Sequence, residues 1–122
     1  MHAIVIEDQA AIRALLAELL RSEGFAVQTF SDASAWEKST EPPADLYIVD
    51  WHLPEGTAES VLKRLMPESS KASCLIVSGC TINLDCFPVE WRTRMAFLEK
   101  PFTAAMFRQL VSALMAAAAR NR

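Results

Sequence analysis

The sequence predicts a single α/β domain over residues 1–122, built on a doubly wound, five-stranded parallel sheet with helices on both faces. Short apolar runs rich in β-branched and aromatic residues recur along the chain, and segments with helical periodicity separate them. Four of these runs end in polar residues, at the strand ends where an open α/β sheet binds ligands. Those four runs are residues 3–6, 46–49, 75–77 and 95–98.

The first half of the chain alternates between strand and helix. Residues 9–23 carry apolar side chains at the helical period, which predicts an amphipathic helix. Gly24 suits the left-handed conformation that is common just past a helix. Residues 25–30 then predict a strand, and Asp32 is a suitable N-cap for a short helix through Trp36.

The second half continues the alternation. Glu-Pro-Pro at residues 41–43 predicts a loop before the third strand. Residues 61–65 indicate a third helix that ends at Pro67, and a last helix follows Pro101 with Thr103 as its cap. One face of that last helix carries Phe107, Leu110, Val111 and Leu114.

Residues 81–93 fit the alternation least well. The pattern requires a helix there, but Pro88 lacks an N–H group and clashes with the preceding turn inside a helix. We therefore expect the fourth helix to be short, over residues 82–87, or the segment to be irregular.

Composition excludes several functional classes. The net charge of −3, from 12 basic and 15 acidic residues, provides no electrostatic footprint for nucleic acid or an acidic membrane surface. The first residues lack the basic region of a signal peptide, and the apolar stretch at residues 110–119 is too short to span a bilayer. Hydrophobic residues make up 52% of the chain, which indicates a packed core. We expect a soluble, cytoplasmic protein.

The three cysteines predict neither a disulfide framework nor a zinc site. Their number is odd and they lack Cys-x-x-Cys spacing. Reduced, mostly buried thiols fit a cytoplasmic protein better. Cys80 lies two residues past Ser78, close enough to be influenced by the polar strand-end residues. The cysteines are Cys74, Cys80 and Cys86.

Carboxylates, a hydroxyl and an ammonium meet at the predicted sheet edge. Glu7, Asp8 and Asp50 provide the oxygen ligands that Mg²⁺ prefers, and a cation would remove their mutual repulsion. Lys100 and Ser78 supply a positive charge and a donor for phosphate oxygens. A carboxylate attacking a phosphoryl group needs such screening, and its product would be an aspartyl phosphate.

Each of these residues also has an ordinary structural interpretation. Acids at strand ends are often solvated loop starts, Lys100 alone could be a surface charge, and Ser78-Gly79 alone is a common turn. The joint placement of all of them at separate strand ends favours a functional site.

The order and spacing of these residues resemble the receiver domain of two-component response regulators, over nearly the whole chain. The motifs that carry the resemblance are residues 4–8, 49–54, 76–79 and 97–102. The resemblance implies a flavodoxin-like sheet with strand order 2-1-3-4-5. It implies that Asp50 is the phosphoacceptor and that Mg²⁺ is bound by Asp8, Asp50 and the backbone carbonyl of His52, with Glu7 acting through water.

The resemblance also implies which residues would bind a phosphoryl group and respond to it. Ser78 and Lys100 would bind it, and Phe97 occupies the position of a switch aromatic, although a plain core role suits Phe97 equally well. A cis peptide between Lys100 and Pro101 is implied too. The phosphoryl donor would be a sensor histidine kinase or a histidine phosphotransfer protein.

Three functions remain open at the level of sequence. The leading one is a phosphoacceptor that catalyses only its own phosphorylation and dephosphorylation, and so is no enzyme in the usual sense. A second is a receiver-like interaction module that works without phosphorylation. A third, a phosphohydrolase, would need an acid where His52 stands. Two residues depart from the family pattern: Ala58 stands in place of a glycine in a loop and touches no ligand, and Pro88 falls in the fourth helix, which the resemblance implies helps form the output surface and a possible homodimer.

Overall fold

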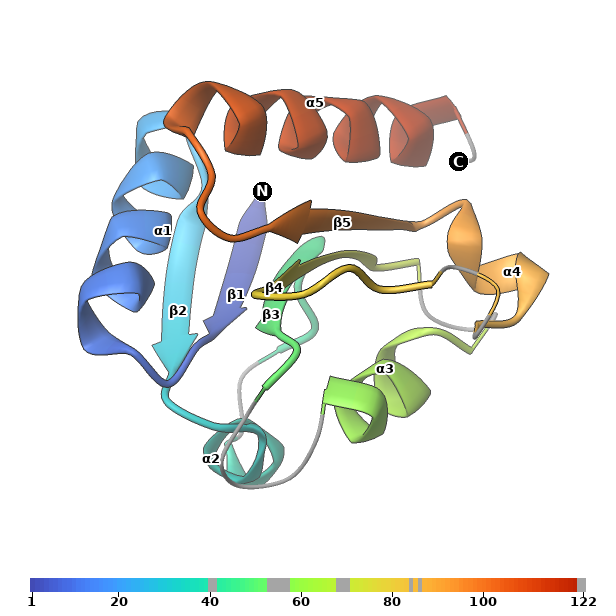
Figure 1. Ribbon diagram of the computed structural model, residues 1–122, viewed down its shortest axis with the longest axis horizontal. Helices are drawn as coiled ribbons and strands as arrows, with labels where there is room; N and C mark the ends of the chain where they lie inside the picture. The colour runs from blue at the N-terminus through green and yellow to red at the C-terminus, as the bar shows by residue number, and fades with distance from the viewer. Residues whose placement is uncertain (40–41, 53–57, 68–70, 84, 86, 121–122) are drawn as a thin grey trace.

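Five parallel strands form one sheet in the order β2-β1-β3-β4-β5, which is the predicted order (Figure 1). The computed structural model describes residues 1–39, 42–52, 58–67, 71–83, 85 and 87–120. The strands are β1 (His2–Ile6), β2 (Ala26–Phe30), β3 (Leu46–Asp50), β4 (Ser73–Ser78) and β5 (Met95–Glu99). The helices are α1 (Ala10–Ser22), α2 (Ala33–Lys38), α3 (Ala58–Leu65), α4 (Val89–Arg92) and α5 (Ala104–Arg120).

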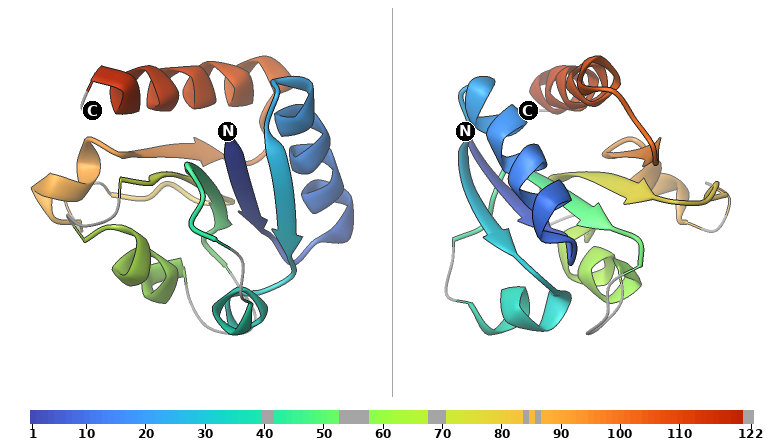
Figure 2. Two further views of the ribbon diagram at one scale, coloured as in Figure 1. Left: turned by 180° about the vertical axis from the view of Figure 1, so that it is seen from behind. Right: turned by 60° about the vertical axis from the view of Figure 1, so that its left-hand side comes forward.

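Helices cover both faces of the sheet, as the two views of Figure 2 show. Side chains of α1 and α5 pack on one face, against alternate strand residues such as Val5 and Ile48. Side chains of α2 and α3 pack on the other face, against the intervening residues Ile4 and Val49. Because successive strand residues point to opposite faces and both are covered, the central strands read as continuous apolar runs.

The predicted caps of α2 and α5 and the predicted glycine after α1 are confirmed. The Oδ1 atom of Asp32 accepts a 2.7 Å hydrogen bond from the backbone N–H of Ala35, which caps α2. Gly24 has a φ of 94°, the left-handed conformation expected after α1. The Oγ1 atom of Thr103 accepts a 3.1 Å hydrogen bond from the N–H of Met106 and caps α5.

The fourth helix is short, as predicted, but the predicted position over residues 82–87 is wrong, because α4 begins after Pro88. Proline is tolerated at the start of a helix, where the first N–H groups have no partner within the helix. Residues 81–83 have irregular backbone, and residues 84 and 86 lie outside the described part of the chain. The side chain of Arg92 donates two hydrogen bonds, of 2.9 and 3.1 Å, to the carbonyl of Phe87 and so ties α4 to the segment before it.

None of the helices in the described ranges combines the length and the apolar character needed to cross a membrane.

Candidate functional site

The parallel strands end along one edge of the sheet (Figure 1), and the predicted polar residues end these strands or directly follow them. Neighbouring strands are in register to within one residue at this edge. The side chains that end the strands or follow them therefore come together: Glu7 and Asp8 after β1, Asp50 in β3, Ser78 in β4 and Lys100 after β5.

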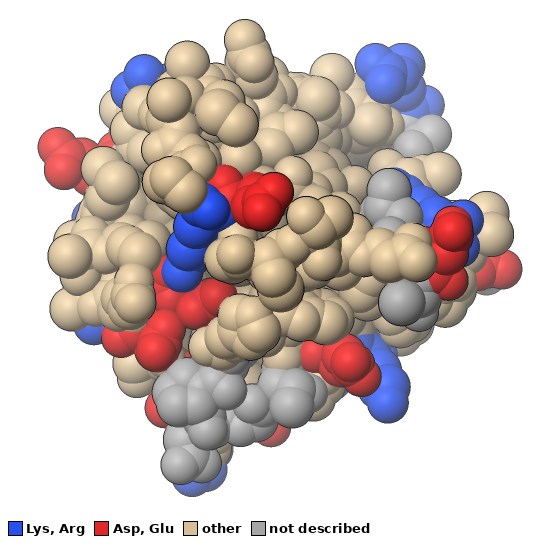
Figure 3. Space-filling view, in the orientation of Figure 1, with Lys and Arg blue, Asp and Glu red and all other residues tan. Residues whose placement is uncertain are grey.

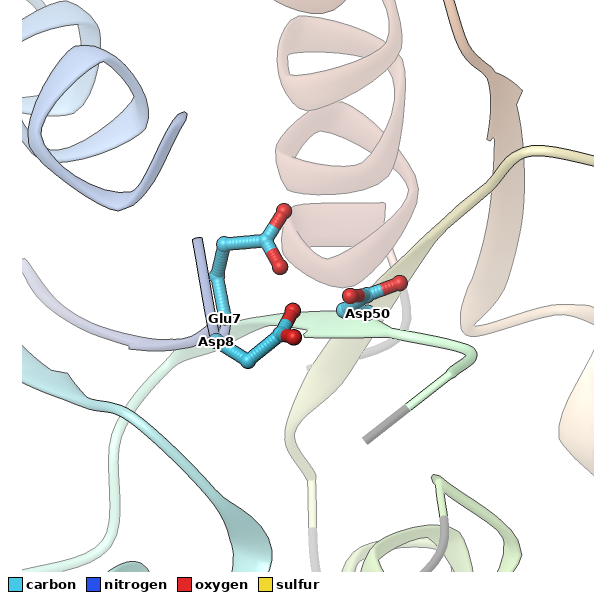
Figure 4. Close-up of side chains that lie close together, drawn as sticks. All are labelled: Glu7, Asp8 and Asp50. Atoms are coloured by element: carbon cyan, nitrogen blue, oxygen red, sulfur yellow. The ribbon is translucent and has the colours of Figure 1, made fainter. Parts of the chain in front are cut away.

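Glu7, Asp8 and Asp50 form a cluster of carboxylates (Figure 4). One oxygen from each lies within 4.8 Å of the others. Glu7 is 1% exposed and Asp50 is 4% exposed, whereas Asp8 faces solvent. Two buried acids and one exposed acid are thus close enough together to be ligands of a single cation.

The electrostatics of the cluster favour a bound cation. Burial, together with the neighbouring Asp50, raises the pKa of Glu7 to about 7, and Lys100 only partly offsets this. For Asp8, the effect of burial is outweighed by hydrogen bonding with Glu7 and Asp50, and its pKa is lowered. Among the described residues, the Oε2 atom of Glu7 is buried without a hydrogen-bond partner. A buried carboxylate oxygen with no donor, beside two further carboxylates, fits the oxygen-rich ligand set of Mg²⁺.

Lys100 provides the positive charge of the site. Its Nζ atom lies 3.0 Å from Oε1 of Glu7 and 3.8 Å from Oδ2 of Asp50. The peptide between Lys100 and Pro101 is cis, as the resemblance implied. The ammonium thus lies between the two buried acids, within reach of a group attached to Asp50.

Ser78 is buried beside the cluster, and its hydroxyl contacts Cys80. Its Oγ atom accepts a 3.1 Å hydrogen bond from the N–H of Cys80 and lies 3.4 Å from the Cys80 sulfur. The expectation of mostly buried thiols is wrong for Cys80, which is exposed because it follows the end of β4. Cys74 is buried within β4, and its burial raises the pKa of its thiol. Cys86 lies outside the described residues.

His52 contributes its backbone N–H to the site, and its exposed side chain lies near Cys80. Its N–H donates a 3.2 Å hydrogen bond to Oδ1 of Asp50, which orients the carboxylate. The imidazole is exposed, with Nε2 3.7 Å from the sulfur of Cys80. The predicted metal-binding role of the His52 carbonyl stays a prediction. Leu53 and Pro54 of the same motif lie outside the described residues.

Phe97 lies on β5 in a cluster of aromatic rings. Its ring is 5.7 Å from the ring of Phe87, which in turn is 5.9 Å from the ring of Trp51. Trp51 directly follows Asp50. Phe97 is half-buried, so both the switch role and the core role remain predictions.

Sequence reasoning missed Arg13. Its Nη1 atom donates hydrogen bonds to the backbone carbonyls of Glu7, at 2.8 Å, and Asp8, at 3.3 Å. Arg13 therefore holds the turn that carries two of the three acids. The available signal was a single arginine in the first turn of the helix that follows the acid pair.

Comparison with known proteins agrees with this arrangement. The family model of the response regulator receiver domain matches residues 3–112. The phosphate regulon transcriptional regulatory protein PhoB of Escherichia coli K12 is 37% identical over 67 residues, which are 54% of this chain and 29% of PhoB. The Klebsiella pneumoniae PhoB is 36% identical over the same shares. The match thus spans less than a third of the length of these relatives.

Solved structures show the same fold. A CheY-like receiver domain from Methylobacillus flagellatus superposes with a TM-score of 0.69, at 23% identity, covering 93% of this chain and 98% of that one. Response regulator TrrA from Thermotoga maritima, solved in complex with Mg²⁺-BeF, superposes with a TM-score of 0.75, at 21% identity, covering 93% and 97%. Because the family model covers most of the chain, this protein belongs to the family of response regulator receiver domains of two-component signalling.

Proposed function

We propose that this receiver domain takes a phosphoryl group from a phosphohistidine onto Asp50. The observation that supports this most strongly is the buried carboxylate cluster, in which Glu7 Oε2 has no partner among the described residues and Lys100 lies 3.8 Å from Asp50. An ordinary solvated strand end would not bury two acids together, because their repulsion has to be compensated.

The three acids have separate roles in this proposal. Asp8 and Asp50 would hold Mg²⁺ together with the backbone carbonyl of His52, and Glu7 would act through water. The ion supplies positive charge that screens the approach of a phosphoryl group to a carboxylate. The N–H of His52 keeps the carboxylate of Asp50 oriented through its bond to Oδ1.

The transfer itself exchanges one bond for another. A carboxylate oxygen of Asp50 forms a bond to phosphorus while the phosphorus–nitrogen bond of the donor breaks, and the electron pair stays on the donor imidazole. The ammonium of Lys100 would turn from Glu7 to the new phosphoryl oxygens, and Ser78 would donate its hydroxyl to one of them. Ser78 would have to give up its contact with the Cys80 sulfur in order to do so.

The proposed output is a change in protein contacts. Movement of Ser78 would alter the packing around Phe97 and so carry the change toward β5. The donor is a sensor histidine kinase or a histidine phosphotransfer protein, and the proposed setting is the cytoplasm. We propose no direct contact with nucleic acid or membrane; a homodimer is one form the output could take. Residues 1–122 are proposed to act as one receiver domain that modifies only itself.

Incubation with acetyl phosphate and Mg²⁺, followed by intact-mass measurement, tests the proposal. We expect one added phosphoryl group in the native protein and none in Asp50→Asn. An unmodified native protein, under conditions that label another receiver domain, would instead indicate an interaction module that works without phosphorylation. Repeated turnover of a phosphate ester would indicate a phosphohydrolase.

A further inference from the structure

A groove of about 490 Å³ lies between α3 and the segment that joins β4 to α4. Its walls include the aromatic rings of Trp51, Phe87 and Trp91 and the aliphatic side chains of Leu62 and Ile82. Trp51, Ile82 and Trp91 are only half-buried, so apolar surface is open to solvent there. None of the proposed metal or phosphoryl ligands is among the described residues that line this groove.

The groove carries balanced charge. Its charged lining residues within the described chain, Glu59 and Lys63, stand four positions apart on α3, so that an acid and a base lie side by side on one rim. Its remaining polar lining consists of the thiol of Cys80, the hydroxyl of Thr81 and the amide of Asn83. A charged ligand would lose its hydration here, and each charge on the rim that it could pair with already has an opposite charge beside it on α3. The lining therefore complements an uncharged molecule.

The size of the groove fits a small molecule better than a protein. Small-molecule sites are concave, largely apolar and about 300–1,000 Å³ in volume. A stable protein interface needs about 20–30 residues on each side. The groove is lined by 11 described residues. Figure 3 shows that uncharged residues also occupy most of the face it draws, with acidic and basic side chains gathered in small groups.

The walls of the groove contact the proposed phosphoryl site. Trp51 directly follows Asp50, and Cys80 contacts the hydroxyl of Ser78. The ring of Phe87 lies 5.9 Å from that of Trp51 and 5.7 Å from that of Phe97. A change in either place therefore displaces side chains that belong to the other.

We propose that this groove binds a small, uncharged aromatic molecule, and that its binding is linked to the phosphorylation of Asp50. The proposed binding site depends only on the groove, whereas the proposed link to Asp50 rests on the proposed function. Because linkage is reciprocal, a ligand that binds one state more tightly also favours that state of Asp50 by the same factor.

Three biphenyls of similar size test the binding site: 4-phenylphenol, which is uncharged, biphenyl-4-carboxylate and biphenyl-4-ylmethylammonium. Titrations followed by calorimetry and by backbone amide NMR shifts use the unmodified full chain. For 4-phenylphenol we expect a Kd of about 1 mM or tighter, with shifts at Trp51, Ile82 and Phe87. We expect both charged probes to bind at least about tenfold more weakly.

Variants locate the binding. Ile82→Asp places a charge in the groove, and Thr81→Trp fills it without adding one. Each should raise the Kd for 4-phenylphenol at least about tenfold. Val89→Asp on the exposed surface of α4, outside the lining, should leave the Kd unchanged. Equal affinity for all three probes would overturn the proposed binding site. A loss of 4-phenylphenol affinity in Val89→Asp as large as that in the groove variants would overturn it too. Self-association that Ile82→Asp and Thr81→Trp abolish would identify a second copy as the occupant and overturn it as well.

The link is measured by repeating the titration after treatment with acetyl phosphate and Mg²⁺. We expect the Kd to change at least about threefold in the modified protein and to stay constant in Asp50→Asn. An unchanged Kd in protein whose mass shows the phosphoryl group would overturn the link and leave the proposed function standing. A protein that gains no mass would contradict the proposed function, and with it the link, while the groove would still bind the probe.

Discussion

The two sides of the sheet's carboxyl edge are built differently. On one side, Glu7 follows β1 and Asp50 ends β3, two central strands that are buried except at His2 and whose pairing sets the separation of the two acids. On the other side, β4 is followed by irregular residues and by the four-residue helix α4. The difference teaches that the proposed chemistry is placed on buried strands, whereas the segments proposed to respond to it are irregular or very short. Substitutions of side chains that end or follow the strands, including Ser78 and Lys100, should change reactivity, whereas those in the irregular segment before α4 and in α4 itself should change it little.

The largest effect is expected from Lys100→Ala. Its ammonium is the charge that lies between Glu7 and Asp50, so its removal should slow phosphorylation by acetyl phosphate about 100-fold. Intact-mass time courses measure the rate. Arg108→Ala is the matched control, since it removes a cation that pairs with Glu23 elsewhere, and it should leave the rate unchanged. A Lys100→Ala rate within twofold of native would contradict the proposed role.

Arg13→Ala should have the next largest effect. Without its hydrogen bonds to the carbonyls of Glu7 and Asp8, the turn that carries both acids is held less firmly. We expect Mg²⁺ to bind about tenfold more weakly, as measured by titration of tryptophan fluorescence. Arg21→Ala removes an exposed arginine from the last turn of the same helix and should not change the affinity. Equal affinities in the two variants would show that Arg13 has no positioning role.

The stability of the metal-free protein should depend on pH through Glu7. The pKa of this carboxyl is about 7 in the folded protein and 4.5 in its ordinary state, so the folded protein holds the proton more tightly than the unfolded chain does. The free energy of unfolding should therefore decrease as pH rises from about 4.5 to 7. Chemical denaturation across this range measures it.

Two comparisons make the pH prediction specific. Glu7→Gln should be more stable than native at pH 7 and should lack this part of the decrease. Saturating Mg²⁺ should reduce the decrease in the native protein, because a cation stabilises the ionised acids. A native protein whose stability rises through the same window would show that Glu7 is ionised at little cost.

The smallest effect is expected from Pro88→Ala. Pro88 is exposed at the N-terminal end of α4 and has none of the proposed ligands as a neighbour in sequence. We expect the free energy of unfolding to change by less than about 1 kcal/mol and the phosphorylation rate to stay within about twofold. A tenfold change in rate would mean that the α4 side participates in the chemistry after all.

Much of the fold could be predicted because local patterns and burial agree. The apolar runs of β3 and β4 are buried along their whole length, and the capping residues Asp32, Gly24 and Thr103 mark the helix ends. Strand-end positions could be predicted for the same reason. A residue that closes a buried parallel strand has only one edge of the sheet at which to lie.

Contacts that depend on side-chain direction could not be predicted. Nothing in the spacing of the sequence shows that Lys100 lies closer to Glu7 than to Asp50, or that Ser78 contacts Cys80. The start of α4 after Pro88 was missed because a proline excludes a helix interior but permits a helix start. Arg13 was missed because its partners are backbone carbonyls, which carry no sequence signature.

The most direct test of the account is to identify the residue that carries the phosphoryl group. After reaction with acetyl phosphate and Mg²⁺, reduction with sodium borohydride converts an aspartyl phosphate into homoserine, which peptide sequencing by mass spectrometry locates. The account predicts homoserine at position 50, dependent on Mg²⁺ and absent when Lys100→Ala is reacted for the same short time. Homoserine at position 8, or phosphate retained on a serine or histidine, would contradict it.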